Sequence, residues 1–131
     1  MSMADNPLYK ELLRIMEEAN RMFPDAQIDG LVLATEDGII ISHTLSRDIA
    51  EESEIPNIAA AAAVLYKLGN DTVNDMEKGN LEGVFVHGDD GYILVGRVGV
   101  AILLILAKRD AKTGVLLHIL DRAKARLESK I

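Results

Sequence analysis

An unbroken apolar run constrains the fold of this chain more than any other feature. Val100 to Ala107 reads Val-Ala-Ile-Leu-Leu-Ile-Leu-Ala, with an apolar side chain at every position rather than at alternate ones. The run is rich in strand-forming residues, and successive side chains of a strand point to opposite faces. Both faces of this strand must therefore be covered, so we expect it in the middle of a sheet that has helices on both sides.

Two further strands precede this run. Leu81 to His87 and Tyr92 to Val98 are rich in strand-forming residues and are separated by Gly88-Asp89-Asp90-Gly91, while a tight turn around Gly99 leads into the run. Glycine and aspartate punctuate strands in this way at turns. We expect the three strands to form an antiparallel meander.

A hairpin is predicted nearer the N-terminus. Gly30 to Thr35 and Ile39 to Thr44 flank a short segment that ends in Gly38, and glycine supplies the positive φ that a tight hairpin turn needs. The following segment, Leu45 to Glu54, is polar and is expected to be a solvated connector. Its acidic residues lack the regular ligand spacing and the central glycine of a calcium loop; they are Asp48, Glu51, Glu52 and Glu54.

Three helices complete the pattern. Asn6-Pro7 is a favourable helix start, and the first helix should end at Pro24 and Asp25. The second should run from about Ile55 to Lys78 and the third from about Lys112 to Glu128. The order α-β-β-α-β-β-β-α predicts an α/β (α+β) fold, a three-layer sandwich around a five-stranded antiparallel sheet. We expect one domain over residues 1–131, with the first and last helices on one face.

The central helix then lies alone on the other face, where one helix cannot cover a five-stranded sheet. Stepping 100° per residue places one apolar row toward the sheet: Ile58, Ala62, Leu65, Gly69, Val73 and Met76. Apolar residues widen this row on both flanks, and Ala59 to Ala63 is small on almost every side. Two interpretations remain open: alanine has the highest helix propensity, or the surplus apolar surface binds a second partner.

Composition excludes several classes of function. The net charge of -7 repels phosphate backbones, so nucleic acid is not expected as a partner. The chain has no cysteine, and Met1 to Lys10 lacks the features of a signal peptide, so we expect a cytoplasmic protein. The longest apolar stretch, Tyr92 to Ala107, contains Arg97 and is too short for a membrane span, so direct membrane insertion is not expected either.

Catalytic motifs are absent from the sequence. There is no Walker A motif, and the three histidines, His43, His87 and His118, are scattered without the spacing of a metal site. Ser42 and His43 are neighbours on one predicted strand and therefore point to opposite faces, and no nucleophile elbow surrounds them. We expect no cofactor, no metal and no enzymatic activity.

The chain resembles the roadblock family of dynein light-chain-like and small-GTPase-regulating proteins, and its fold resembles that of the profilin-like sandwiches. The resemblance rests on the hairpin from Gly30 to Ser42, the alanine-rich helix from Ile58 to Leu68, and Leu103 to Ala107 leading through Thr113 to Leu117 into the last helix. It implies a homodimer in which the strand from Leu81 to His87 pairs with its symmetry mate and the two central helices lie side by side. It also implies that the paired helices bind a small Ras-like GTPase, either as a scaffold or by stimulating GTP hydrolysis.

The resemblance also assigns residues to these two surfaces. The GTPase-facing positions would be Ala59, Ala60, Ala63, Lys67 and Asn70. The dimer interface would contain Val64, Leu68, Leu81, Val84, Phe85 and Val86. The chain lacks the long terminal extensions with which some family members hold a partner or a membrane, so recruitment by such tails is not expected.

Two other functions are compatible with the pattern. A small-molecule-sensing α/β domain would enclose a ligand and needs a cavity with a few convergent polar groups. An adaptor light chain of a motor or of a longin-like complex would use the same apolar surface for another client.

Overall fold

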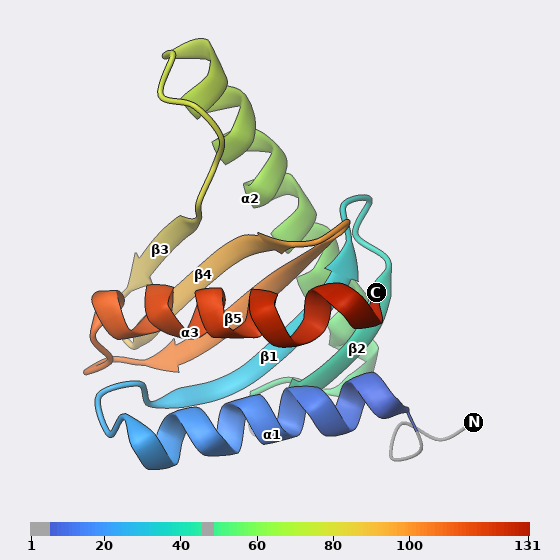
Figure 1. Ribbon diagram of the computed structural model, residues 1–131, viewed down its shortest axis with the longest axis vertical. Coiled ribbons are helices and arrows are strands. Elements are labelled where there is room, and N and C mark those ends of the chain that lie inside the picture. Colours follow the sequence, from blue (N-terminus) through green and yellow to red (C-terminus); the bar gives the residue numbers. More distant parts are fainter. Residues whose placement is uncertain (1–5, 46–48) are drawn as a thin grey trace.

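The computed structural model describes residues 6–45 and 49–131, so Asp48 of the acidic connector lies outside the described residues. The elements follow the predicted order (Figure 1). They are α1 (Pro7–Met22), β1 (Ile28–Thr35), β2 (Ile40–Leu45), the short 3-10 helix η2 (Glu52–Glu54), α2 (Ile55–Asp75), β3 (Val84–Gly88), β4 (Gly91–Val98), β5 (Ala101–Lys108), α3 (Thr113–Leu127) and the short 3-10 helix η3 (Glu128–Lys130).

The five strands form one antiparallel sheet in the order β2-β1-β5-β4-β3. The strand that is apolar throughout, β5, lies at its centre between β1 and β4, as its sequence predicted. Ile105 illustrates its position, because it pairs with Leu31 on one side and with Leu94 on the other. The edges of the sheet are β2 and β3.

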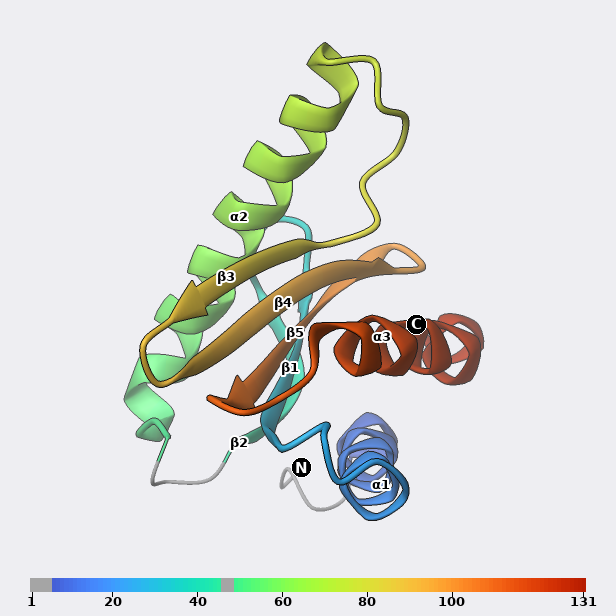
Figure 2. The same cartoon turned by 90° about the vertical axis from the view of Figure 1, so that its left-hand side faces the viewer.

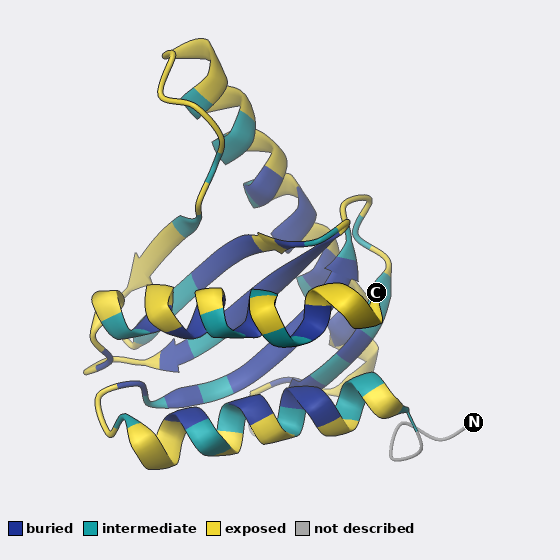
Figure 3. Cartoon of the chain, in the orientation of Figure 1, coloured by how far each residue is buried: buried dark blue, intermediate teal, exposed yellow. Residues whose placement is uncertain are grey.

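Helices cover both faces of this sheet and divide the interior into two cores. Helices α1 and α3 share one face and α2 lies on the other (Figure 2), which confirms the predicted three-layer sandwich. The core under α1 and α3 contains long side chains such as Leu12, Leu103 and Leu120. The core under α2 is smaller and combines alanines of the helix, such as Ala59 and Ala62, with larger side chains such as Ile102. The end of α2 that extends beyond the sheet is mostly exposed (Figure 3).

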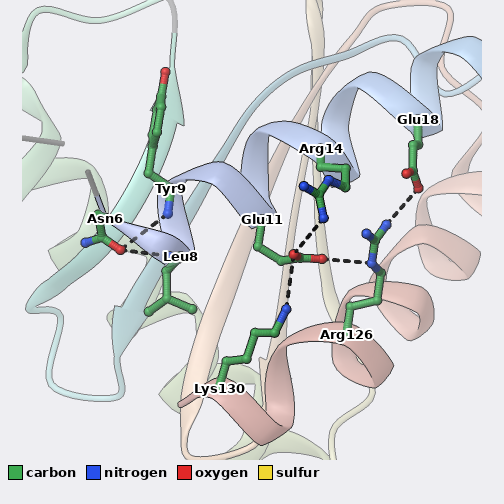
Figure 4. A network of polar contacts seen from close by, with 8 residues as sticks. All are labelled: Asn6, Leu8, Tyr9, Glu11, Arg14, Glu18, Arg126 and Lys130. Carbon is green, nitrogen blue, oxygen red and sulfur yellow. Dashed lines mark hydrogen bonds and ion pairs between the residues drawn. The ribbon is translucent and has the colours of Figure 1, made fainter. Parts of the chain in front are cut away.

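Polar contacts fix α1 at its start and against α3. The side chain of Asn6 caps the helix by accepting hydrogen bonds from the backbone N–H groups of the next residues, at 2.8 Å from Leu8. One turn later the buried Glu11 carboxylate contacts Arg126 at 2.9 Å and Lys130 at 3.1 Å (Figure 4). Burial alone would raise the pKa of Glu11, but the cationic partners outweigh it and the pKa is lowered.

Two boundaries differ from the sequence prediction by three residues, more than any other. Helix α2 ends at Asp75 rather than Lys78, because Glu77 and Gly79 adopt the left-handed conformation with φ of 57° and 88°. Strand β3 begins at Val84 rather than Leu81, and Leu81 packs instead on the core under α2. The chain leaves the helix through this turn and descends along it before β3 begins (Figure 2).

Candidate protein-interaction surface

Helix α2 meets the sheet through a row of buried residues that differs from the predicted one. The buried side chains are those of Ile55, Ala59, Ala62, Ala63 and Tyr66. Of the predicted inward row only Ala62 is fully buried, and Met76 is exposed. The helix is therefore rotated about its axis toward Ala59 and Ala63, which the sequence analysis placed outward.

This rotation corrects two residues of the predicted GTPase-facing surface. Ala59 is 0% and Ala63 8% exposed, so their own sheet covers the side chains that were expected to meet a partner. The turn between β1 and β2 explains why the helix has small residues here. A Cβ on Gly38 would lie 3.0 Å from the Cα of Ala60 and 3.4 Å from the Cβ of Ala63. The alanines thus let the backbone of a hairpin turn approach the helix closely, and that backbone belongs to the same chain.

The outward side of α2 carries large apolar side chains. Val64 is 67% and Leu68 62% exposed, and they lie one helical turn apart on the same flank. Ala60 and Lys67 are exposed on the same outward side, within one turn of Val64, while Asn70 is half-buried. Lys67 lies 3.7 Å from Asp71, but both side chains are well exposed, so this ion pair adds little stability.

Strand β3 presents an apolar edge. Three successive positions of this strand are hydrophobic: Val84, Phe85 and Val86. Although hydrophobic, none of them is fully buried: Val84 is half-buried, Phe85 is 36% exposed and Val86 is 38% exposed. Val84 and Val86 face α2, because they pair with Val95 and Ile93 of the core beneath that helix. Phe85 pairs with Leu94 and faces the side of α3. Both faces of the edge strand therefore expose apolar surface.

Helix α2 and strand β3, which carry these exposed residues, pack against each other. Gly69 lies directly against Val84 and Leu81, where any larger side chain would collide with them, so this flank of α2 is the one beside β3. Leu68 points about 100° around the helix from Gly69, toward solvent, and Val64 lies one turn before Leu68 on that outward side. We call the exposed set Val64, Leu68, Phe85 and Val86 the α2–β3 strip. Predicted interface residues Leu81 and Val84 lie half-buried behind it.

The serine and histidine side chains that the sequence analysis considered for catalysis or metal binding do not come together. Ser42 is fully buried on the face of α1 and α3, whereas His43 pairs with Val32 and faces α2, so the two point to opposite faces as predicted. Burial lowers the pKa of His43, although the charge of Glu52 opposes this effect. His87 stacks on Tyr92 with ring centroids 4.2 Å apart. Within residues 6–45 and 49–131, no group of three or more His, Cys, Asp or Glu side chains could hold a metal ion.

No helix in the described part of the chain is both long enough and apolar enough to cross a bilayer.

The sandwich and its exposed strip define a class of protein, a small α/β domain of the roadblock and profilin-like type with an apolar helix-and-edge surface. The Roadblock/LC7 domain model matches residues 17–107, and the chain belongs to this family. The match runs from the middle of α1 to the end of β5 and includes all of α2 and β3. A comparison with curated proteins gives no match.

Solved structures share this fold. A Roadblock/LC7 domain from Streptomyces avermitilis has a TM-score of 0.75 at 23% identity, covering 89% of this chain and 94% of that one. The gliding protein MglB from Thermus thermophilus has a TM-score of 0.74 at 15% identity, covering 95% and 90%. Acanthamoeba castellanii profilin IB is more distant, with a TM-score of 0.53 at 11% identity over 79% and 87%. These structures confirm the predicted roadblock and profilin-like architecture.

Proposed function

We propose that the chain is a non-catalytic, homodimeric scaffold or regulator of a small Ras-like GTPase, acting as a single domain over residues 1–131 in the cytoplasm. The observation that carries the proposal is the α2–β3 strip. Four large apolar side chains on a helix and the adjoining sheet edge remain exposed in one copy of the chain. Large apolar side chains exposed on neighbouring elements are typical of association sites.

The first half of the proposal is self-association through β3. An exposed hydrophobic edge strand pairs readily with another strand, and natural proteins usually protect it. The other edge, β2, has two buried side chains and is packed against α1, whereas β3 has none. Pairing of β3 with a second β3 about a two-fold axis would make the same surface complementary to itself. It would also bring Val64 and Leu68 toward the equivalent helix.

The second half concerns the polar and small residues on the outward side of α2. Ala60 and Lys67 are exposed there within one turn of Val64, and neither is part of the α2–β3 strip. We propose Ala60 and Lys67 as the GTPase-facing residues, with half-buried Asn70 beside them. Ala59 and Ala63 are not part of this surface. The chain would act by holding or repositioning the GTPase rather than by supplying a catalytic group.

Nucleotide-dependent capture tests this function. Immobilised protein is incubated with native lysate containing GDP or a non-hydrolysable GTP analogue, and retained proteins are identified by mass spectrometry. We expect a small GTPase whose retention depends on the nucleotide, and addition of the chain to that purified GTPase then shows whether hydrolysis accelerates. Lys67→Glu should weaken capture.

Lys10→Glu is the matched control, because Lys10 is exposed on α1 at the opposite face and the change in charge is the same. Equal weakening by the two variants would refute the assignment of the α2 surface. Capture of motor or longin-like subunits without any GTPase would favour the adaptor function instead.

A further inference from the structure

A hollow of about 310 Å³ lies at the end of the sheet where β3 and β5 finish and β1 begins. Its walls include Ile93 and Leu106, which belong to the side of the sheet that α2 covers, together with Val86 and Ile49. Figure 1 shows this end of the sheet, at the left of the view, away from α2. The hollow is therefore open, mainly apolar and large enough to hold a long side chain.

An acidic group lines this apolar hollow. Asp29 lies where the pairing of β1 with β5 shifts register between Ile28 and Gly30. Its Oδ1 atom is buried and has no hydrogen-bond partner among the described residues. Burial raises the pKa of Asp29, and the positive charge of Lys108 offsets only part of this effect. The two residues form no ion pair within the described part of the chain.

An unpaired, buried carboxylate oxygen destabilises a fold unless something binds it. The turn between β3 and β4 adds a second acid, Asp90, to the lining of the hollow. A ligand that fits both the acidic groups and the apolar walls of the hollow needs a positive charge with N–H donors. It also needs an apolar stem that can lie along Ile93 and Leu106. Few, convergent polar groups in an apolar hollow are typical of binding sites for small groups.

We propose that this hollow binds an ammonium or guanidinium group carried on a short aliphatic stem, with Asp29 as its acceptor. The same chemistry is available from a free alkylamine or alkylguanidine and from a lysine or arginine side chain of a protein partner. None of the GTPase-facing residues lines the hollow, although Val86 of the α2–β3 strip forms part of its wall.

The test is a titration of the isotope-labelled full chain followed by NMR. The free source is represented by n-butylguanidinium, the side-chain source by the blocked peptide acetyl-Gly-Arg-Gly-amide, and n-butanol is the neutral control. We expect the amides of Ile93, Leu106 and their neighbours to shift with at least one of the two cations and not with n-butanol. Binding of the peptide without binding of n-butylguanidinium would indicate a protein partner. Binding of n-butylguanidinium without binding of the peptide would indicate a free ligand.

Two variants locate the acceptor. Asp29→Asn keeps the size of the side chain and should weaken binding by at least about tenfold, the loss of one charge-assisted hydrogen bond. Asp90→Asn removes the same charge from the rim and should change affinity by no more than about threefold, since exposed charges are screened. Without ligand, Asp29→Asn should be at least as stable as the wild type, because a desolvated charge is removed.

Three results would overturn the proposal. Absence of shifts with both cations, or equal shifts with n-butanol, would show that the hollow does not select positive charge. Equal weakening by the Asp29 and Asp90 variants would show that only the net charge matters. A clear loss of stability in Asp29→Asn would show that the carboxylate already has a partner within its own chain.

Discussion

Replacing Leu68 by lysine tests whether the α2–β3 strip is the dimer interface. Full burial of a leucine side chain contributes roughly 1.5–3 kcal/mol, and 62% of Leu68 is still exposed in one copy. Covering the remainder therefore contributes about 1–2 kcal/mol. A two-fold axis repeats every contact, so one substitution removes about 2–4 kcal/mol from dimerisation, which is a rise of roughly 30- to 700-fold in the dissociation constant.

Sedimentation equilibrium measures this change. The wild type should sediment as a dimer, and Leu68→Lys should shift to monomer over the same concentration range while its circular dichroism stays unchanged, because the side chain is not part of a core. Val100→Lys is the matched control. Val100 is 70% exposed, but it lies in the turn between β4 and β5, outside the strip. A monomeric wild type, or equal dissociation in both variants, would refute the reasoning.

Four further substitutions test the fold. Gly38→Ala should lower the free energy of unfolding in urea by about 2–4 kcal/mol, because it adds a clash with α2 to a strained left-handed backbone. Gly79→Ala has the same φ but open space around it, and should cost only about 1–2 kcal/mol. Ala63→Arg should give an unfolded or aggregated protein by circular dichroism, since the residue is buried; a folded variant would place it outward. Glu11→Gln should lose about 1–2 kcal/mol above pH 5, measured by thermal or urea unfolding. Because the folded-state pKa of Glu11 is lowered, the wild type should lose this advantage as the pH falls through that pKa; a difference independent of pH would contradict the ion-pair explanation.

The type and order of the helices and the five strands could be read from the sequence, because each carries a strong local signal. The apolar run of β5 predicted its central place, and Asn6-Pro7 marked the start of α1 within one residue. Gly38 was correctly placed in a tight turn with positive φ. These features depend on neighbours in the chain and on periodicity, which a single sequence contains.

The orientation of α2 could not be read in the same way. The helix is apolar on most of its circumference, so periodicity alone does not select the side that faces the sheet. In the observed orientation the hairpin turn at Gly38 lies against the backbone of Ala60 and the Cβ of Ala63, a contact between distant segments that periodicity does not report. The start of β3 was also missed, because Leu81 fits a strand pattern but is held by the core under α2.

The small residues and the large exposed residues of α2 therefore have different roles. The sequence offered a choice between alanines that favour the helix and alanines that form an interface. The structure adds a third explanation, since Ala59 and Ala63 are small because the same chain packs on them. What remains for association is Val64 and Leu68, which neither helix propensity nor internal packing explains. An apolar row on the outer flank of a helix beside an exposed apolar strand lowers the solubility of a monomer, so its presence is best explained by a partner that covers helix and strand together.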